Sequence, residues 1–128
     1  MKILVVDDHA AFRRSLSEFL RSRAGIEVVG EAANGKEAVE QTARLHPDLV
    51  LMDVSMPTMS GYDATRIIKE QHPETRVVIL SSHSGEVYRS AALESHADGY
   101  IEKHTMKSDL THLLEDSGIG SSNVRIAI

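Results

Sequence analysis

Asp48-Leu-Val-Leu-Met-Asp53-Val-Ser-Met-Pro57-Thr-Met-Ser-Gly61 is the stretch of this sequence that decides the fold. Residues 49–52 are all apolar, and a run without polar alternation is typical of a strand buried on both faces. The run ends in the carboxylate of Asp53, after which Pro57 and Gly61 predict a sharp turn. Open α/β sheets bind ligands at the carboxyl ends of their parallel strands, which makes Asp53 a candidate site residue. A single strand-end Asp more often caps a loop, so the other strand ends decide between these two interpretations.

The composition is that of one globular domain. The 128 residues are 41% hydrophobic and 26% charged, which suits a packed core with a charged surface. There is no cysteine, and this excludes disulfides, thiolate metal sites and cysteine nucleophiles. The apolar run after Lys2 is only four residues long, too short for a signal peptide or a membrane span, so we expect a cytoplasmic protein. The net charge of −5 argues against nucleic-acid binding by this chain alone and suits a domain that meets proteins or cations.

Further segments have the pattern of strands. Residues 3–6 and 77–80 are fully apolar like 49–52, so these strands should be central. Residues 26–32 and 98–102 mix polar and apolar side chains and should be edges. Between the strands, apolar residues recur at helical spacing: Phe12, Leu16, Phe19 and Leu20; Ala38, Val39, Thr42 and Leu45; Ala64, Ile67 and Ile68; Val87, Tyr88 and Ala91; and Leu110, Leu113 and Leu114. This alternation predicts a flavodoxin-like (βα)5 three-layer sandwich, with a parallel five-stranded sheet of order 2-1-3-4-5 and helices on both faces.

The end of the chain has the composition of a linker. We expect residues 1–116 to form the domain and residues 117–128 to form a tail, because residues 117–123 are rich in Gly and Ser. Residues 124–128, Val-Arg-Ile-Ala-Ile, alternate as a strand does. They either pair with another element or are an ordered piece of linker.

The strand ends of the predicted sheet carry reactive side chains. With the first and third strands adjacent, Asp7 and Asp8 lie beside Asp53 at one edge of the sheet. Three carboxylates this close raise one another's pKa unless a cation is present, and Mg²⁺ is the hard divalent cation that suits oxygen ligands. The fourth strand adds the hydroxyl of Ser81, and the fifth adds the ammonium of Lys103. Together these groups could place a phosphoryl group on a carboxylate, with the metal and Lys103 neutralising its oxygens and Ser81 donating to one of them.

Each of these residues has a simpler interpretation when it is taken alone. Asp7 and Asp8 would most often cap a helix N-terminus, and Ser81 would most often be a turn hydroxyl. Lys103 would be a solvated surface charge, and Tyr100 a half-buried edge-strand residue rather than part of a switch. It is much less probable that all of these residues fall at strand ends by chance than that any one of them does. Their common position therefore favours a shared site.

The same residues belong to motifs that extend over most of the chain. These are Val6-Asp7-Asp8-His9 followed by Phe12-Arg13; Pro47-Asp48-Leu-Val-Leu-Met-Asp53 with Met56-Pro57 and Gly61; Ser81; and Asp98-Gly-Tyr100-Ile-Glu-Lys103. With them the chain resembles the receiver domains of two-component response regulators, over about residues 2–116. Val28-Val-Gly-Glu-Ala, Asn34-Gly35 and the Asp-Asp-His start further resemble the NarL/FixJ subfamily, whose output is a LuxR-type helix-turn-helix DNA-binding domain.

The resemblance implies a role for each residue at the acidic end of the site. Asp53 would be the phosphoacceptor, and a sensor histidine kinase would be the partner that supplies the phosphoryl group. Asp8 and Asp53 would bind Mg²⁺ directly, together with the backbone carbonyl of Ser55. Asp7 would act on the metal mainly through water. The chain would be no enzyme in the ordinary sense, although it would take part in its own phosphorylation and dephosphorylation.

The resemblance also implies a switch. Lys103 would pair with the phosphoryl group, Ser81 would move to donate to it, and Tyr100 would turn inward behind Ser81. The surface that changes would be built from residues 87–114, where a second copy forms a phosphorylation-dependent homodimer or an output domain docks. DNA would be bound only through an output domain that this chain does not contain, which would make the full protein a regulator of transcription. No membrane partner is expected.

The chain departs from the family pattern at two positions and at its end. The switch hydroxyl is Ser81 where threonine is commoner, which keeps the donor and loses a methyl group. Lys103 is followed by His104 where many receivers have proline. The chain also stops after a short fifth helix, without a helix-turn-helix. Either the natural protein is longer, or it is a stand-alone receiver that acts by protein–protein interaction or as a phosphate sink.

Other classes of protein fit the sequence less well. An aspartyl phosphatase would have Asp-x-Asp after its first strand, where this chain has Asp7-Asp8-His9. A nucleotide-binding domain needs a glycine-rich loop there, and residues 8–12 contain no glycine. A serine hydrolase would need Gly-x-Ser-x-Gly around Ser82, which is absent. A binding module that has lost phosphorylation would have no reason to keep the acid, the hydroxyl and the lysine together.

Overall fold

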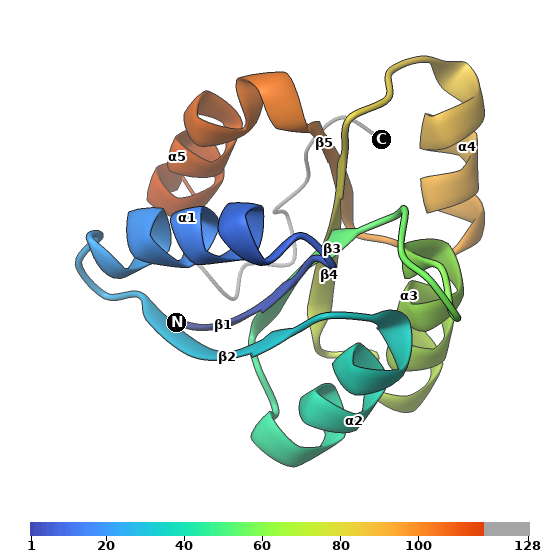
Figure 1. The fold of residues 1–128 in the computed structure, drawn as a ribbon, viewed down its shortest axis with the longest axis horizontal. Helices are drawn as coiled ribbons and strands as arrows, with labels where there is room; N and C mark the ends of the chain where they lie inside the picture. Colours follow the sequence, from blue (N-terminus) through green and yellow to red (C-terminus); the bar gives the residue numbers. More distant parts are fainter. Residues whose placement is uncertain (117–128) are drawn as a thin grey trace.

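The sheet has the strand order that the sequence predicts (Figure 1). The structure, a computed structural model, describes residues 1–116. Its strands are β1 (Lys2–Val6), β2 (Glu27–Ala32), β3 (Leu49–Asp53), β4 (Arg76–Ser81) and β5 (Gly99–Glu102), all parallel in the order β2-β1-β3-β4-β5. The fully apolar strands β1, β3 and β4 are central and the mixed strands β2 and β5 are edges, because only a central strand is buried on both faces.

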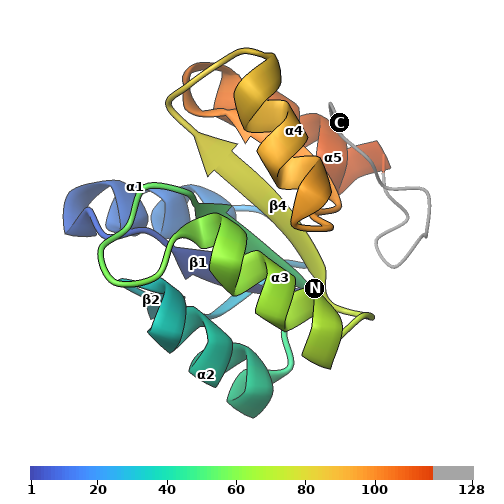
Figure 2. The same ribbon diagram turned by 90° about the vertical axis from the view of Figure 1, so that its right-hand side faces the viewer.

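Helices cover both faces of the sheet (Figure 1 and Figure 2). They are α1 (Ala10–Arg21), α2 (Gly35–Leu45), α3 (Gly61–Gln71), α4 (Glu86–Glu94) and α5 (Met106–Asp116). The helices α1 and α5 pack on one face, and α2, α3 and α4 pack on the other. Successive side chains of a strand point to opposite faces, so β1 contributes Leu4 and Val6 to one core and Ile3 and Val5 to the other. The flavodoxin-like three-layer sandwich is confirmed.

Local signals set where the helices begin and end. At the start of α2, the Asn34 side chain accepts a hydrogen bond from the Glu37 N–H at 2.8 Å, and the Glu37 carboxylate accepts a backbone N–H in return. The same helix ends at Leu45, and the next residue, His46, has a φ of 48° in the left-handed region. A short 3₁₀ helix, η1 (Lys103–Thr105), joins β5 to α5 and is not predicted by the pattern of apolar residues.

The turn after β3 folds the chain back against the end of that strand. The Gly61 N–H donates a hydrogen bond to the Val54 carbonyl at 3.1 Å, which closes the loop that carries Ser55 and Pro57. A Cβ at position 61 would overlap the backbone carbonyl of Asp53, so only glycine fits there. This glycine therefore sets how closely the loop lies over the reactive end of β3.

No helix within residues 1–116 is long and apolar enough to span a membrane. The predicted tail at residues 117–128, including the strand-like alternation of 124–128, lies outside the described residues. The domain boundary therefore stays a prediction.

We predict that Gly61→Ala destabilises the protein by about 3 kcal/mol. The added methyl group would meet backbone atoms of Asp53 and Val54, which cannot move without displacing the end of β3. Urea denaturation followed by circular dichroism measures the change in the free energy of unfolding.

Gly30→Ala is the matched control for this prediction. Its methyl group would meet side-chain atoms of Gln41, Leu45 and Leu4, which can rotate away. We expect a loss of about 1 kcal/mol or less. Equal losses in the two variants would contradict the role assigned to Gly61.

Candidate functional site

Two buried carboxylates meet at the carboxyl end of the sheet. Asp7 directly follows β1, and Asp53 is the last residue of β3. The two strands pair in parallel with Val6 opposite Met52, so the residue after each of these lies at the same edge. Asp7 is 1% exposed and Asp53 is 4% exposed. Both carboxylates are thus removed from water, which is costly unless cations or hydrogen-bond donors compensate for it.

The side chain of Lys103 supplies a compensating charge. Lys103 begins η1 directly after β5, and its Nζ lies 2.8 Å from Asp7 Oδ2 and 3.0 Å from Asp53 Oδ1. Because β4 separates β5 from β3, the long lysine side chain has to reach past the end of β4. The structure brings these three residues together, as the sequence predicts.

Burial and charge change the acid–base properties of this group. Burial raises the pKa of the Asp53 carboxyl; the hydrogen bond from Lys103 acts in the opposite direction, and the charge of Asp7 raises the pKa further. Burial lowers the pKa of the Lys103 ammonium, but its bonds to Asp7 and Asp53 outweigh that effect and leave the pKa raised. Lys103 is therefore a permanent cation of the site, whereas Asp53 carries its charge in an unfavourable environment.

Asp8 contributes an oxygen without a hydrogen-bond partner among the described residues. This atom, Oδ1, is buried, and the nearest basic nitrogen is His9 Nδ1 at 3.2 Å. The ligand atoms of Asp7, Asp8 and His9 all lie within 4.8 Å of one another. A buried carboxylate oxygen without a donor suits a hard divalent cation such as Mg²⁺, so Asp7 and Asp8 fit the predicted metal, although this group contains His9 and does not contain the predicted ligand Asp53. Ser55, whose carbonyl is expected to be a further ligand, lies in the loop just after β3 and is exposed.

The residues of the expected switch are connected through the backbone of His83. Ser81 ends β4, one residue beyond Leu80, which pairs with Asp53. The buried Ser81 hydroxyl accepts a hydrogen bond from the His83 N–H at 3.0 Å. The phenol of Tyr100 donates to the His83 carbonyl at 2.6 Å, and Tyr100 is 0% exposed, so the half-buried interpretation of Tyr100 is wrong. The ring already has the inward position that the resemblance implies only after phosphorylation.

Other side chains contact the site without having been predicted to do so. Arg13 Nη1 donates to the Asp7 carbonyl at 2.7 Å and Arg13 Nε to Glu31 Oε1 at 2.9 Å, which ties the loop after β1 to β2. The Lys103 Nζ lies 4.2 Å from the centre of the Phe12 ring. The helical pattern assigns Phe12 and Arg13 to opposite sides of α1, and it carries no signal for contacts with residues far along the chain.

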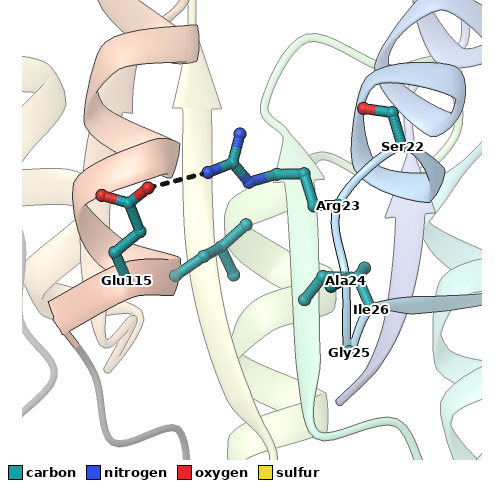
Figure 3. A pocket seen from close by; sticks show the side chains of 7 residues that line it. Ser22, Arg23, Ala24, Gly25, Ile26 and Glu115 are labelled. Atoms are coloured by element: carbon teal, nitrogen blue, oxygen red, sulfur yellow. Dashed lines mark hydrogen bonds and ion pairs between the residues drawn. The ribbon is translucent and has the colours of Figure 1, made fainter.

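A cavity of about 450 Å³ lies at the other end of the sheet (Figure 3). It is lined by Ser22, Arg23, Ala24, Gly25, Ile26, Leu114 and Glu115. Arg23 Nη2 and Glu115 Oε2 form an ion pair of 3.1 Å beside it. It shares no described residue with the carboxylate cluster, so the two sites are separate.

The sequence is similar to known receiver domains over nearly its whole length. Residues 3–115 match the family model of the response regulator receiver domain. The response regulator protein VraR of Staphylococcus epidermidis is 44% identical over 124 residues, which are 95% of this chain and 58% of that protein. The chain thus spans little more than half the length of the curated relatives that it matches.

Solved structures share the fold. A two-component response regulator of the LuxR family from Aurantimonas sp. SI85-9A1 has a TM-score of 0.89 at 32% identity, covering 98% of this chain and 88% of that one. The signal receiver domain of the response regulator NarL from Mycobacterium tuberculosis has a TM-score of 0.83 at 30% identity, covering 90% of this chain and 93% of that one. Sequence and fold therefore agree on one family and on its LuxR-type branch.

We predict that Asp53→Asn stabilises the metal-free protein by about 1 kcal/mol at neutral pH. A raised pKa means that the folded protein holds this proton more tightly than the unfolded chain, so the ionised carboxylate destabilises the fold above that pKa. The gain should be largest above the folded-state pKa and should shrink as the pH falls through it, where wild-type Asp53 becomes protonated. Urea denaturation in EDTA at a series of pH values measures it.

Glu70→Gln removes an exposed carboxylate from α3 and serves as the control. Its effect should stay within about 0.5 kcal/mol at every pH. A destabilised Asp53→Asn variant at neutral pH would show that Lys103 compensates for the burial of Asp53 completely.

Proposed function

This chain belongs to the response regulator receiver family of two-component systems, in its NarL/FixJ branch, and we propose that Asp53 accepts a phosphoryl group from a sensor histidine kinase. The observation that carries the proposal is the position of the Asp53 carboxylate. It is buried at a strand end, paired with Lys103 and adjacent to Asp7. Receiver domains interact with histidine kinases.

The arrangement supports attack by Asp53 on phosphorus. A carboxylate oxygen of Asp53 would form the new P–O bond while the bond from phosphorus to the donor's nitrogen breaks and that nitrogen keeps the electron pair. Lys103 Nζ, now 3.0 Å from Asp53 Oδ1, would then pair with the phosphoryl oxygens without leaving Asp7. The chain would thus take part in its own phosphorylation and dephosphorylation.

Asp8 Oδ1 is buried without a hydrogen-bond partner among residues 1–116, which supports the role of Asp8 as a direct metal ligand. Both Asp7 oxygens are engaged, Oδ1 by the His9 N–H at 2.8 Å and Oδ2 by Lys103, which favours contact with the metal through water. Asp53 and the Ser55 carbonyl would complete the ligands that the chain offers. When bound, Mg²⁺ would supply positive charge next to the phosphoryl oxygens.

The Ser81 hydroxyl would have a different hydrogen-bond partner in each of the two states of the switch. Ser81 Oγ accepts the His83 N–H in this structure and would donate to a phosphoryl oxygen after phosphorylation, drawing the loop after β4 inward. The Tyr100 phenol donates a hydrogen bond to the His83 carbonyl, so a movement of that loop would also change the position of the Tyr100 ring. The two residues would thereby couple the site to α4 and β5.

The output surface would be the face formed by residues 87–114. It carries the exposed apolar side chains Val87 and Leu93 on α4. A second copy would dock there. The full protein would be cytoplasmic and about as long as its curated relatives, and it would bind DNA through a LuxR-type output domain. The second candidate is a stand-alone receiver that acts through protein contacts or as a phosphate sink.

We predict that a small phosphodonor with Mg²⁺ phosphorylates the wild-type chain and leaves Asp53→Asn unmodified. Intact-mass measurement detects the added phosphoryl group. Asp8→Ala should lose most Mg²⁺ binding and slow labelling by about tenfold or more, since both depend on the same oxygen.

Asp63→Asn, which removes a 60% exposed carboxylate side chain on α3, is the control and should label at the wild-type rate. Undiminished labelling of Asp53→Asn would sink the assignment of the phosphoacceptor. Normal Mg²⁺ affinity in Asp8→Ala would refute the ligand set alone.

We predict that Ser81→Ala still accepts a phosphoryl group but responds weakly to it. A hydrogen bond to a charged group contributes roughly 1.5–3 kcal/mol, enough to make a minority state the major one. Beryllofluoride with Mg²⁺ mimics the phosphoryl group, and NMR chemical shifts of residues 87–114 report the response.

The neighbouring Ser82→Ala removes an exposed hydroxyl and should respond as the wild type does. Sedimentation of the same samples tests whether the response includes dimerisation. Equal shifts in Ser81→Ala and in the wild type would exclude the coupling.

A further inference from the structure

The ammonium of Lys103 has a third neighbour that carries no charge. Besides the two carboxylates, its Nζ lies 4.2 Å from the centre of the Phe12 ring. A cation within about 6 Å of a ring centroid is attracted by the negative face of the ring, more strongly when water is excluded. The Lys103 side chain is 17% exposed, so this contact is largely shielded from solvent.

The position of the Phe12 ring is fixed by packing. Phe12 lies on the first turns of α1, half-buried, and packs against the core between the sheet and the helices α1 and α5. That core includes Val5 of β1 and Leu16 of α1. The ring therefore packs against the same elements that hold Asp7.

One of the two charged partners of Lys103 changes chemically during the proposed reaction. The Asp53 carboxylate would become an acyl phosphate, while Asp7 would keep its contact with Lys103 Nζ. Lys103 also leaves β5 on a short 3₁₀ helix, and its side chain crosses the end of β4 before it reaches the site. A contact that persists through this change restricts where the ammonium can go.

We propose that Phe12 is a positioning residue for phosphoryl transfer, whose ring face holds the Lys103 ammonium over the reactive end of β3. This role rests on the proposed phosphorylation of Asp53. The ring directs Lys103 to the phosphoryl oxygens as charge develops there, without itself touching the reacting atoms.

The competing explanation is that Phe12 only fills the core. Phe19 offers a matched comparison, because it is half-buried on the same helix and packs against the same core. Its ring also faces cations, with Arg23 Cζ at 5.6 Å and Lys107 Nζ at 5.7 Å. Neither cation contacts the carboxylate cluster, so Phe19→Leu reproduces the loss of packing and of a cation contact away from the site.

The first experiment measures the rate constant of phosphorylation by a small phosphodonor in excess Mg²⁺. Phe12→Leu keeps an apolar side chain without a π face and should be slower than the wild type by about fivefold. Phe12→Tyr keeps the face and should restore the rate to within about twofold, and Phe19→Leu should react as the wild type does. The NMR shift of the Lys103 ε-methylene protons should lose its ring-current contribution in Phe12→Leu alone.

A second experiment changes the charge distribution of the Phe12 ring and leaves the packing of the core nearly unchanged. The chain has two phenylalanines, so in the Phe19→Leu background Phe12 is the only one. Trifluorinated phenylalanine incorporated into this background removes the negative face while the packing stays nearly the same. We expect the rate to fall by about threefold or more relative to the same background with ordinary phenylalanine.

Each result separates the inference from the proposed function. A wild-type chain that accepts no phosphoryl group overturns both. A labelled wild type with unchanged rates in Phe12→Leu and in the fluorinated protein overturns the role of Phe12 and leaves the proposed function intact. Slow reaction of Phe12→Leu and Phe12→Tyr alike, with no effect of fluorination, assigns Phe12 to packing.

Discussion

The parallel pairing of β1 with β3 is the constraint on which the rest of this structure depends. It places the ends of the two strands at one edge of the sheet, so Asp7 and Asp53 are neighbours although they are far apart in the chain. Helices cover both faces of the sheet, so these carboxylates are buried as well as adjacent. Lys103, which arrives from the far edge strand, is the cation that makes this arrangement tolerable.

Lys103 only partly compensates for the buried negative charge of the carboxylates, so the site can respond to a cation or to a chemical change. Burial and Asp7 keep the pKa of Asp53 raised in spite of Lys103, and a buried oxygen of Asp8 has no hydrogen-bond partner within the described part of the chain. Binding of a cation, or a covalent change at Asp53, therefore alters a group of buried charges that is not fully neutralised. That property suits a receiver domain, in which a chemical change at one carboxylate has to affect the rest of the molecule.

The two halves of the sheet differ in how firmly their helices are held. The helices α1, α2 and α3 each bury several side chains against the central strands. By contrast, α4 begins at Gly85 without a side-chain cap and buries only Ala92 fully. Shifting α4 thus disturbs little packing, and the loop that connects it to the site begins after Ser81 and contains His83. The weakly held helix lies where the proposed output surface is.

The fold could be predicted because its signals are local: apolar runs mark buried strands, helical spacing marks the covering helices, and strand ends carry Asp53 and Lys103. By itself the sequence determined which strands are central, because a strand buried on both faces is apolar at every position. It also determined which charged groups gather at one edge, because each of them follows a strand in the chain. Only the tertiary structure decided which atoms meet there, such as the Phe12 ring with Lys103 and the Tyr100 phenol with the His83 carbonyl. These contacts join segments distant in the chain, and their geometry depends on how helices and loops pack against the sheet, which no local spacing records.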